Sequence, residues 1–365
     1  MKSRGHRLPL LSTAVLIALT VAACGSGTAA PGGQDAGSNA NDNSGKIDPL
    51  VTAYKGPKVD LSGVSLTVTT SEPDALNMGA LFMFDKLRQW GAKLDVVTLT
   101  TTSGIQTMIA GRSQLASQGA DEVVLGRGQG ADVTAIGSAR SKQVYVLVAK
   151  NSIDGVSDLK GKKIAMSGPS GFDTLLSKYA LKKAGLAQTD AKLVQIGGSP
   201  DRGAALIAGT VDAATIFLST WENVKSRAKG LHLIENFAST TKFPGDAYYA
   251  MTSYLDKNPK LALGVACANL EANDWINSGE KGFIDFAQRH VKGVDPASLK
   301  VLWQDSQRDQ YYPTDPTQVI SADGLGSLET AMLDSGEITK KASVADAVDT
   351  SFLQKAATMG CGSTH

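Results

Sequence analysis

A loop of small and hydroxylated residues, Ser167–Gly171, carries the clearest chemical signal in the sequence. Lys163–Met166 before it reads as a short strand, and Phe172 opens an apolar stripe at the three- to four-residue spacing of a helix. Ser170 or Asp173 can cap that helix. The free N–H groups of a helix start favour an anion or a polar ligand oxygen, so this loop is either a ligand cradle or an ordinary turn between strand and helix.

Two further turns share this design. Thr100–Gly104 lies between a predicted strand and a short helix, and the turn that contains Ser199 does the same. The stretches Val97–Gly111 and Gln195–Gly209 follow one order of strand, small polar turn, helix and Ile-Ala-Gly. This weak internal similarity indicates two lobes of similar βα construction, in which the N-termini of the helices face a common space.

Groups that could catalyse a reaction or bind a metal are sparse. The four histidines lie at positions 6, 232, 290 and 365, and we find no Ser–His–Asp grouping and no metal-ligand spacing. The glycine-rich segment Gly126–Gly130 lacks the strand–turn–helix context of a nucleotide fingerprint. A net charge of +1 with dispersed Lys and Arg disfavours a nucleic-acid partner. The sequence therefore favours a binding protein without a cofactor over an enzyme.

The N-terminus predicts export. The basic segment Lys2–Arg7 precedes an apolar stretch, Leu8–Ala23, which is short for a permanent membrane span. Val21–Cys24 reads Val-Ala-Ala-Cys and resembles a bacterial lipobox, which implies a signal peptide over residues 1–23 and a lipid on Cys24. A plain signal peptide with a chance cysteine is the alternative. Residues 24–58 are rich in Gly, Ser and Asn, so we expect a flexible tether there.

Lipidation of Cys24 leaves Cys267 and Cys361 in an oxidising compartment. Such a pair can form a disulfide that joins the C-terminal tail to a helix. The alternative is a buried free thiol at Cys267, inside the apolar run Leu261–Leu270, and a loose Cys361.

Hydrophobic periodicity predicts an alternation of strands and helices, followed by a mainly helical C-terminal part. The predicted strands are 64–69, 94–99, 113–117, 133–138, 143–149, 163–166, 192–196, 213–217, 231–234 and 248–252. We expect one lobe over 59–150 and 246–365 and the other over 151–245. Two crossings, near 149–153 and 243–248, then form a hinge, and a ligand lies in the cleft between the lobes.

Two stretches resemble a known family. Val156–Ala165, with its Asp-Leu-Lys-Gly-Lys turn, and Ala205–Ala214 are similar to solute-binding proteins of ABC importers in the nitrate, sulfonate, taurine and thiamine-precursor group. The resemblance covers about residues 65–356. It implies an α/β, two-lobed periplasmic-binding-protein fold (type II-like) with two hinge crossovers. It also implies an extracytoplasmic, lipid-anchored monomer that delivers a small molecule to a membrane permease.

The resemblance further implies a ligand site, in which hydroxyls and backbone N–H groups hold ligand oxygens, Phe172 and Trp221 offer apolar faces, and Arg202 pairs with an acidic group. Each has an ordinary alternative: Trp221 could cover a core edge, Arg202 could be a solvated charge, and Glu72 could cap a helix with Asp74. The matching positions are Ser71, Glu72, Thr101, Thr102, Ser103, Ser167, Ser170, Gly171, Phe172, Ser199, Arg202, Leu218, Thr220, Trp221 and Tyr248.

The acidic Glu72 at the first of these positions disfavours a simple inorganic anion. We therefore expect a neutral or amine-bearing organic molecule, aromatic or heterocyclic, stacked on Trp221 or Phe172. Two other functions stay open: a lipoprotein that senses a ligand for a membrane receptor, and an enzyme like the thiamine-pyrimidine synthases. The second would draw its chemistry from histidine, yet neither His232 nor His290 lies at a predicted cleft loop.

Overall fold

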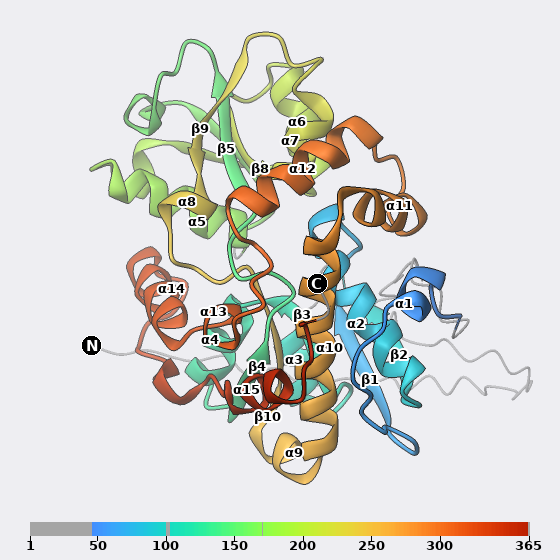
Figure 1. The fold of residues 1–365 in the computed structure, drawn as a ribbon. Helices are drawn as coiled ribbons and strands as arrows, with labels where there is room; N and C mark the ends of the chain where they lie inside the picture. The colour runs from blue at the N-terminus through green and yellow to red at the C-terminus, as the bar shows by residue number, and fades with distance from the viewer. Residues whose placement is uncertain (1–45, 100–102, 170, 364–365) are drawn as a thin grey trace, which may run out of the picture. The chain divides into compact units, whose positions relative to one another are not determined.

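Two five-stranded sheets organise the computed structural model, which describes residues 46–99, 103–169 and 171–363 (Figure 1). These residues all belong to one compact unit, Gly37–His365. The strand orders are β2–β1–β3–β10–β4 and β7–β6–β8–β5–β9. In each sheet one strand, β10 or β5, runs antiparallel to both of its neighbours. The α/β class with two lobes of matching construction is therefore confirmed.

We call each sheet with the helices that connect its strands a lobe. The first-lobe strands are β1 (Ser65–Thr70), β2 (Lys93–Thr98), β3 (Leu115–Gly119), β4 (Val133–Gly137) and β10 (Asp246–Met251). The second-lobe strands are β5 (Tyr145–Lys150), β6 (Lys163–Met166), β7 (Lys192–Gln195), β8 (Ala213–Phe217) and β9 (Leu231–Asn236).

The first-lobe helices are η1 (Ala75–Asn77), α2 (Met78–Gln89), α3 (Gly104–Ile109), α4 (Asp121–Gly128) and α9 (Thr252–Lys257). The second-lobe helices are η2 (Val156–Leu159), α5 (Phe172–Lys183), η3 (Gln188–Asp190), α6 (Ser199–Ile207), α7 (Leu218–Val224) and α8 (Phe237–Thr240). The other helices are α1 (Pro49–Ala53), α10 (Pro259–Ser278), α11 (Glu280–His290), α12 (Pro296–Arg308), α13 (Pro316–Val319), α14 (Ala322–Ser335), η4 (Val344–Asp346) and α15 (Ser351–Thr358).

The first crossing between the sheets lies earlier than predicted. β5 pairs with β8 and β9 in the second sheet, although the predicted boundary at residue 150 assigned it to the first lobe. The chain therefore crosses between Gly137 and Tyr145, and it returns between α8 and β10. The apolar run that forms β5 is equally compatible with either sheet, because periodicity reports burial and not the identity of the pairing strand.

The folded body begins before residue 59, so the predicted tether is too long at its C-terminal end. α1 starts at Pro49 with Asp48 as its N-cap, and Val51 is fully buried. Asp48 also accepts hydrogen bonds from Arg289 in α11, with Nε–Oδ2 at 2.8 Å. A helix of five residues with one buried side chain is too short to show a helical repeat of apolar residues in the sequence.

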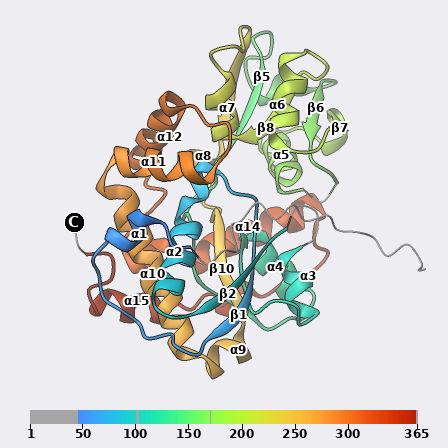
Figure 2. The same cartoon turned by 90° about the vertical axis from the view of Figure 1, so that its right-hand side faces the viewer.

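The C-terminal helices cover both lobes and not the first alone. α14 lies against both α5 and α4 (Figures 1 and 2). Two ion pairs, Lys178–Glu337 and Lys182–Asp334, each 2.8 Å long, tie α5 to the end of this helix. On another side, α12 packs against α7 of the second lobe.

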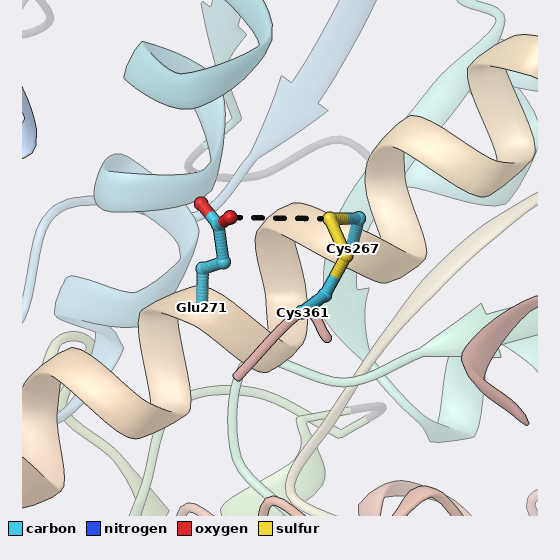
Figure 3. Close-up of side chains that lie close together, drawn as sticks. All are labelled: Cys267, Glu271 and Cys361. Atoms are coloured by element: carbon cyan, nitrogen blue, oxygen red, sulfur yellow. Dashed lines mark hydrogen bonds between the residues drawn. A yellow bond between two sulfur atoms is a disulfide. The ribbon is translucent and has the colours of Figure 1, made fainter. Parts of the chain in front are cut away.

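Cys267 of α10 and Cys361 beyond α15 form a disulfide (Figure 3). The free-thiol alternative therefore does not apply to the structure. Glu271 lies one helical turn after Cys267, with its Oε1 atom 4.0 Å from Sγ. The three side chains come close enough to surround a metal ion, but the bridge leaves no thiolate to ligate one.

The predicted signal peptide, Cys24 and residues 24–45 of the predicted tether lie outside the described residues. Within the part of the chain that is described, no helix is both long and apolar enough to cross a membrane.

Candidate functional site: a cavity between the lobes

A cavity of about 860 Å³ opens between the two lobes. Its walls come from the carboxyl ends of strands in both sheets and from the helix starts that follow them, where ligand sites of open α/β sheets lie. The two crossing segments and the start of β10 supply Arg140, Gln143, Gly245 and Asp246, and α14 and the residues after it supply Met332 and Glu337. A ligand inside would therefore touch both lobes and the segments that connect them.

Polar side chains dominate the first-lobe wall. Ser71, after β1, donates a hydrogen bond to Gln118 Oε1 at 3.2 Å. Gln118 lies one residue before the end of the neighbouring strand β3 and is 8% exposed, and its Nε2 atom has no partner among the described residues. Ser103 caps α3 and donates to Glu122 Oε2, which also accepts from the Ile105 N–H at 3.1 Å.

Two adjacent carboxylates, Asp121 and Glu122, open α4 and line the cavity. Burial and the neighbouring Glu122 raise the pKa of Asp121 to about 8. Burial also raises the pKa of Glu122, against the opposing effect of its hydrogen bonds from Ser103 and Ile105. Two neighbouring carboxyl groups that are partly buried ionise reluctantly unless a cation lies beside them.

Three aromatic rings form the second-lobe wall. Tyr145 begins β5, and its ring centroid lies 4.5 Å from that of Phe217 and 5.9 Å from that of Phe172. All three side chains are half-buried and line the cavity together with Leu175. Burial raises the pKa of the Tyr145 hydroxyl, so this group stays neutral at physiological pH. The wall offers flat apolar faces with one neutral hydroxyl.

The crossing segments are held together by a polar network at the cavity. Arg140 Nη2 lies 3.2 Å from Asp246 Oδ1, and both side chains are almost fully buried. Ser138 Oγ lies 2.5 Å from the Asp246 carbonyl and 2.6 Å from that of Arg140, and the Gln143 amide donates to the Pro244 carbonyl. Three atoms of this network, Arg140 Nε, Gln143 Oε1 and Asp246 Oδ2, have no hydrogen-bond partner among the residues described.

Negative charge exceeds positive charge in this cavity. Its described lining contains five carboxylates and one guanidinium, that of Arg140. Arg140 pairs with Asp246, and Lys178 pairs with Glu337. Within the described ranges, Glu72, Asp121 and Glu122 have no ion-pair partner. The cavity as a whole is therefore acidic.

Six residues predicted from the sequence line this cavity: Ser71, Glu72, Ser103, Gly171, Phe172 and Ser199. Thr101, Thr102 and Ser170 lie outside the described residues. Six others do not line it: Ser167, Arg202, Leu218, Thr220, Trp221 and Tyr248. Their role as ligand contacts finds no support in the geometry.

Arg202 and Ser167 instead build the loop that precedes α5. Arg202 is 2% exposed and donates from Nε to the Thr215 carbonyl at 2.9 Å. It also lies 3.7 Å from Asp173 Oδ2, and Asp173 accepts hydrogen bonds from both the Ser167 N–H and its hydroxyl. Arg202 is therefore neither a ligand contact nor a solvated surface charge, because its guanidinium is buried and donates hydrogen bonds to backbone carbonyls.

The other four residues also serve the interior. Trp221 and Leu218 pack against the apolar cluster of α7 and its neighbours, so the core alternative holds for Trp221. Thr220 shares a 2.8 Å hydrogen bond with Ser199, and the Tyr248 ring is fully buried. Asp74 caps η1, as the helix-cap alternative expected, whereas Glu72 is exposed.

Sequence reasoning missed seven lining residues that decide the character of the cavity: Gln118, Asp121, Glu122, Arg140, Gln143, Tyr145 and Phe217. A signal existed for the first three. They follow a predicted strand and open a predicted helix, which is the same local design that singled out Ser167–Phe172. Arg140, Gln143 and Tyr145 depend on where the chain crosses between the sheets, and that crossing was predicted too late in the chain, whereas Phe217 ends a strand that the sequence did predict.

The similarity to known proteins covers both sequence and fold. A protein of Escherichia coli (strain K12) named for the binding of aliphatic sulfonates is 31% identical over 180 residues, which are 48% of this chain and 54% of that protein. A Brucella abortus (strain 2308) binding protein is 27% identical over 158 residues, 42% of this chain and 48% of its own length. The chain thus spans about half the length of the curated relatives it matches.

Solved structures share the fold at low sequence identity. The periplasmic aliphatic sulphonate binding protein SsuA from Escherichia coli has a TM-score of 0.62 at 19% identity, over 79% of this chain and 92% of that one. The periplasmic nitrate-binding protein NrtA from Synechocystis PCC 6803 has a TM-score of 0.60 at 13% identity, over 83% and 90%. The desulfurization enzyme DSZB has a TM-score of 0.58 at 16% identity, over 81% and 99%.

A family model described as NMT1/THI5 like matches residues 88–277. This range covers just over half of the 365 residues and includes most strands of both sheets, the crossing between β4 and β5, and the two walls of the cavity. The chain belongs to the NMT1/THI5-like family.

Proposed function

We propose that this protein is the extracytoplasmic solute-binding component of an ABC importer, which captures one small organic molecule between its lobes and delivers it to a membrane permease. The observation that carries the proposal is the cavity of about 860 Å³, lined by both lobes and both crossing segments. Its volume suits a ligand of drug-like size, with aromatic faces on one side and polar groups on the other.

The relatives support the same role. SsuA and NrtA are periplasmic binding proteins by name, and this chain shares their fold over about four-fifths of its length. The likeness to DSZB concerns the fold alone, since one fold hosts unrelated activities. Near the cavity, the described residues bring no histidine to the lining. We therefore propose binding without turnover.

A thermal-shift screen of the purified protein tests this function. The panel contains sulfonates, aromatic carboxylates, pyrimidines, flavins, amines and nitrate. A ligand at about 100 times its Kd stabilises a protein by about 2.7 kcal/mol, which raises Tm by several degrees. We expect one chemical class to do so and to be recovered unchanged by mass spectrometry. Conversion of the compound would instead identify an enzyme.

We further propose that a lipid on Cys24 anchors the protein to the outer face of the cell membrane. The support is the Val-Ala-Ala-Cys sequence after a basic and an apolar segment. The wild type should incorporate an alkyne-labelled fatty acid in a bacterial host and fractionate with membranes. Cys24→Ser should lose the label and become soluble or stay unprocessed. A label that persists in Cys24→Ser would contradict the anchor.

A further inference from the structure

We propose that the cavity binds an organic cation, an ammonium or guanidinium group on an aromatic or apolar body, with the charge held by Asp121 and Glu122. This inference rests on the function proposed above and names the chemical class of its ligand. It departs from the sulfonate and nitrate named for the relatives, because carboxylates outnumber cationic groups in the described lining of this chain's cavity.

The first argument is charge. Glu72, Asp121 and Glu122 line the cavity without an ion-pair partner among the described residues. The cavity's one described guanidinium, Arg140, is already paired with Asp246 at 3.2 Å. An anionic ligand would meet no unpaired cationic group in the described lining, and it would oppose the ionisation of these carboxyl groups. A cation would favour their ionised form.

The second argument is the set of buried polar atoms without partners. Gln143 and Asp246 line the cavity and are 1% and 4% exposed, and in each one buried acceptor, Oε1 or Oδ2, receives no hydrogen bond from a described residue. Ammonium and guanidinium groups are pure donors, with three and five N–H bonds. A sulfonate or nitrate has only acceptors and leaves both oxygens unpaired.

Two unpartnered donors accompany these acceptors. Gln118 Nε2, in a side chain that is 8% exposed, and Arg140 Nε, in one that is 6% exposed, also lack partners among the described residues. A neutral hydroxyl or carbonyl oxygen elsewhere on the ligand would satisfy them. The ligand is therefore expected to be polar beyond its charged group, because unpaired buried donors are costly.

A bare metal ion does not fit this lining. Among the described residues, the carboxylates of the cavity do not bring three oxygens within 4.8 Å of one another. The opposite wall, made by Tyr145, Phe172 and Phe217, offers rings and no metal ligand of the usual carboxylate, imidazole or thiolate kind. A body that packs on these rings while its charge faces α4 would fill both sides of the cavity.

The helix dipole explains why two acidic residues stand at the start of α4, but it does not explain the other features of the cavity. Acidic side chains in the first turn of a helix interact favourably with its dipole, and Asp121 and Glu122 open α4. That effect needs no burial, because an exposed side chain provides it equally well. Here both side chains line a cavity that also holds unpartnered donors and acceptors, which the dipole leaves unexplained.

The test compares three probes that share one body: 2-phenylethylammonium, 2-phenylethanol and 2-phenylethanesulfonate. Thermal shift and calorimetric titration are run on the full protein, on Asp121→Asn/Glu122→Gln and on Asp121→Glu. We expect the ammonium to raise Tm most, its Kd to weaken at least tenfold in the double variant, and Asp121→Glu to stay within a few-fold of wild type. Trp221→Ala, outside the cavity, should bind as the wild type does.

Three results would overturn the inference. Stabilisation by the sulfonate and not the ammonium would leave the proposed solute-binding function standing and make the charge assignment wrong. Equal binding of the ammonium by the wild type and the double variant would show that these carboxylates do not hold it. Stabilisation by none of the three probes would reject this ligand class, while the broader panel above still decides the solute-binding function separately.

Discussion

At the scale of single residues, the ionisation of Asp121 in the cavity affects the free energy of unfolding. Its pKa of about 8 in the folded protein lies well above the ordinary value of about 4 in an unfolded chain. Between these values the folded state binds more protons than the unfolded state, so this group destabilises the fold increasingly as pH rises from about 4 to 8. The ligand-free fold is thus less stable because burial keeps Asp121 from ionising as readily as it does in the unfolded chain.

Replacing that carboxylate should therefore stabilise the ligand-free protein. We expect Asp121→Asn to raise Tm by a few degrees at pH 8 and by progressively less towards pH 4, where both states carry the proton. Calorimetric or fluorescence melting over this pH range measures the effect. Asp154→Asn, at an exposed carboxylate, should change Tm little at any pH. An unchanged or lower Tm for Asp121→Asn at pH 8 would contradict this account.

Lys86 of α2 and Glu271 of α10 form a buried ion pair, with side chains 2% and 0% exposed and the charged atoms 2.8 Å apart. Lys86 Nζ also lies 5.2 Å from the ring centroids of Tyr54 and Trp90. Burial raises the pKa of Glu271 to about 7 despite Lys86. Loss of Lys86 would leave an uncompensated buried carboxylate.

Lys86→Met should accordingly destabilise the protein by about 3–5 kcal/mol at pH 8 and by less at pH 5.5, where Glu271 takes up a proton in the folded state. Urea unfolding at the two pH values measures the difference. The double variant Lys86→Met/Glu271→Gln should recover much of the loss at pH 8. A loss that does not depend on pH would mean that packing, and not charge, is the main contribution of Lys86.

At the scale of elements, the disulfide fixes the C-terminal tail to α10. Cys267 and Cys361 are 94 residues apart in the sequence, so their bond closes a long loop. In the chain-entropy model such a loop stabilises the fold by restricting the unfolded chain. The enclosed segment contains α11, α12 and α14, which contact the second lobe directly or through their neighbours.

Removing the disulfide should cost about 2–5 kcal/mol. Urea unfolding of Cys267→Ser/Cys361→Ser measures this, and reduced wild type should behave in the same way. The oxidised wild type with Cys24→Ser serves as the matched control and should keep its stability, since it retains the bridge. Equal stability of the oxidised protein and the double variant would show that the tail packs as well without the bond.

Local patterns predicted the strands well, because the spacing of apolar residues along a short stretch of sequence reports which side chains share a face. The strands expected at 163–166 and 213–217 are β6 and β8, with the same bounds. The sequence around a strand does not show which distant strand it pairs with, so β5 was assigned to the wrong sheet. For the site, the family resemblance pointed to Ser71, Ser103 and Phe172, which line the cavity, whereas Arg140 and Gln143 lie at a crossing that was predicted too late in the chain.

Side-chain type alone also misled. The resemblance implied ligand contacts for a tryptophan and an arginine, yet Trp221 is half-buried against the apolar core and Arg202 donates to the carbonyls of Thr215 and Gly197. The direction of a side chain depends on the tertiary neighbours of its helix, which one sequence does not reveal. Glu72, by contrast, does line the cavity, and its charge agrees with that of Asp121 and Glu122.

At the scale of the whole folded unit, the lobes are joined by two crossing segments and by contacts at their edges. Ser219 of α7 donates to Asp74 of the first lobe at 2.6 Å, and the ion pair Lys178–Glu337 joins α5 to the segment after α14. A ligand that touches both walls would add to these contacts and favour a closed arrangement. Closure would then present one surface to a permease.

Small-angle scattering checks this closing step. With a compound that raises Tm, the radius of gyration should fall, because ligand contacts from both walls draw the lobes together. A compound of equal size that leaves Tm unchanged is the control. An identical scattering curve with and without the stabilising compound would mean that the protein binds its ligand without closing.

The central claim is that the cavity between the lobes binds the solute, and calorimetric titration tests it most directly. The compound that stabilises the wild type most is titrated into the wild type, into Tyr145→Ala/Phe172→Ala and into Trp221→Ala. We predict one site per chain in the wild type, at least tenfold weaker binding when the two cavity rings are removed, and unchanged binding in Trp221→Ala. Unchanged binding in the cavity variant together with loss in Trp221→Ala would contradict the claim and place the ligand site elsewhere on the second lobe.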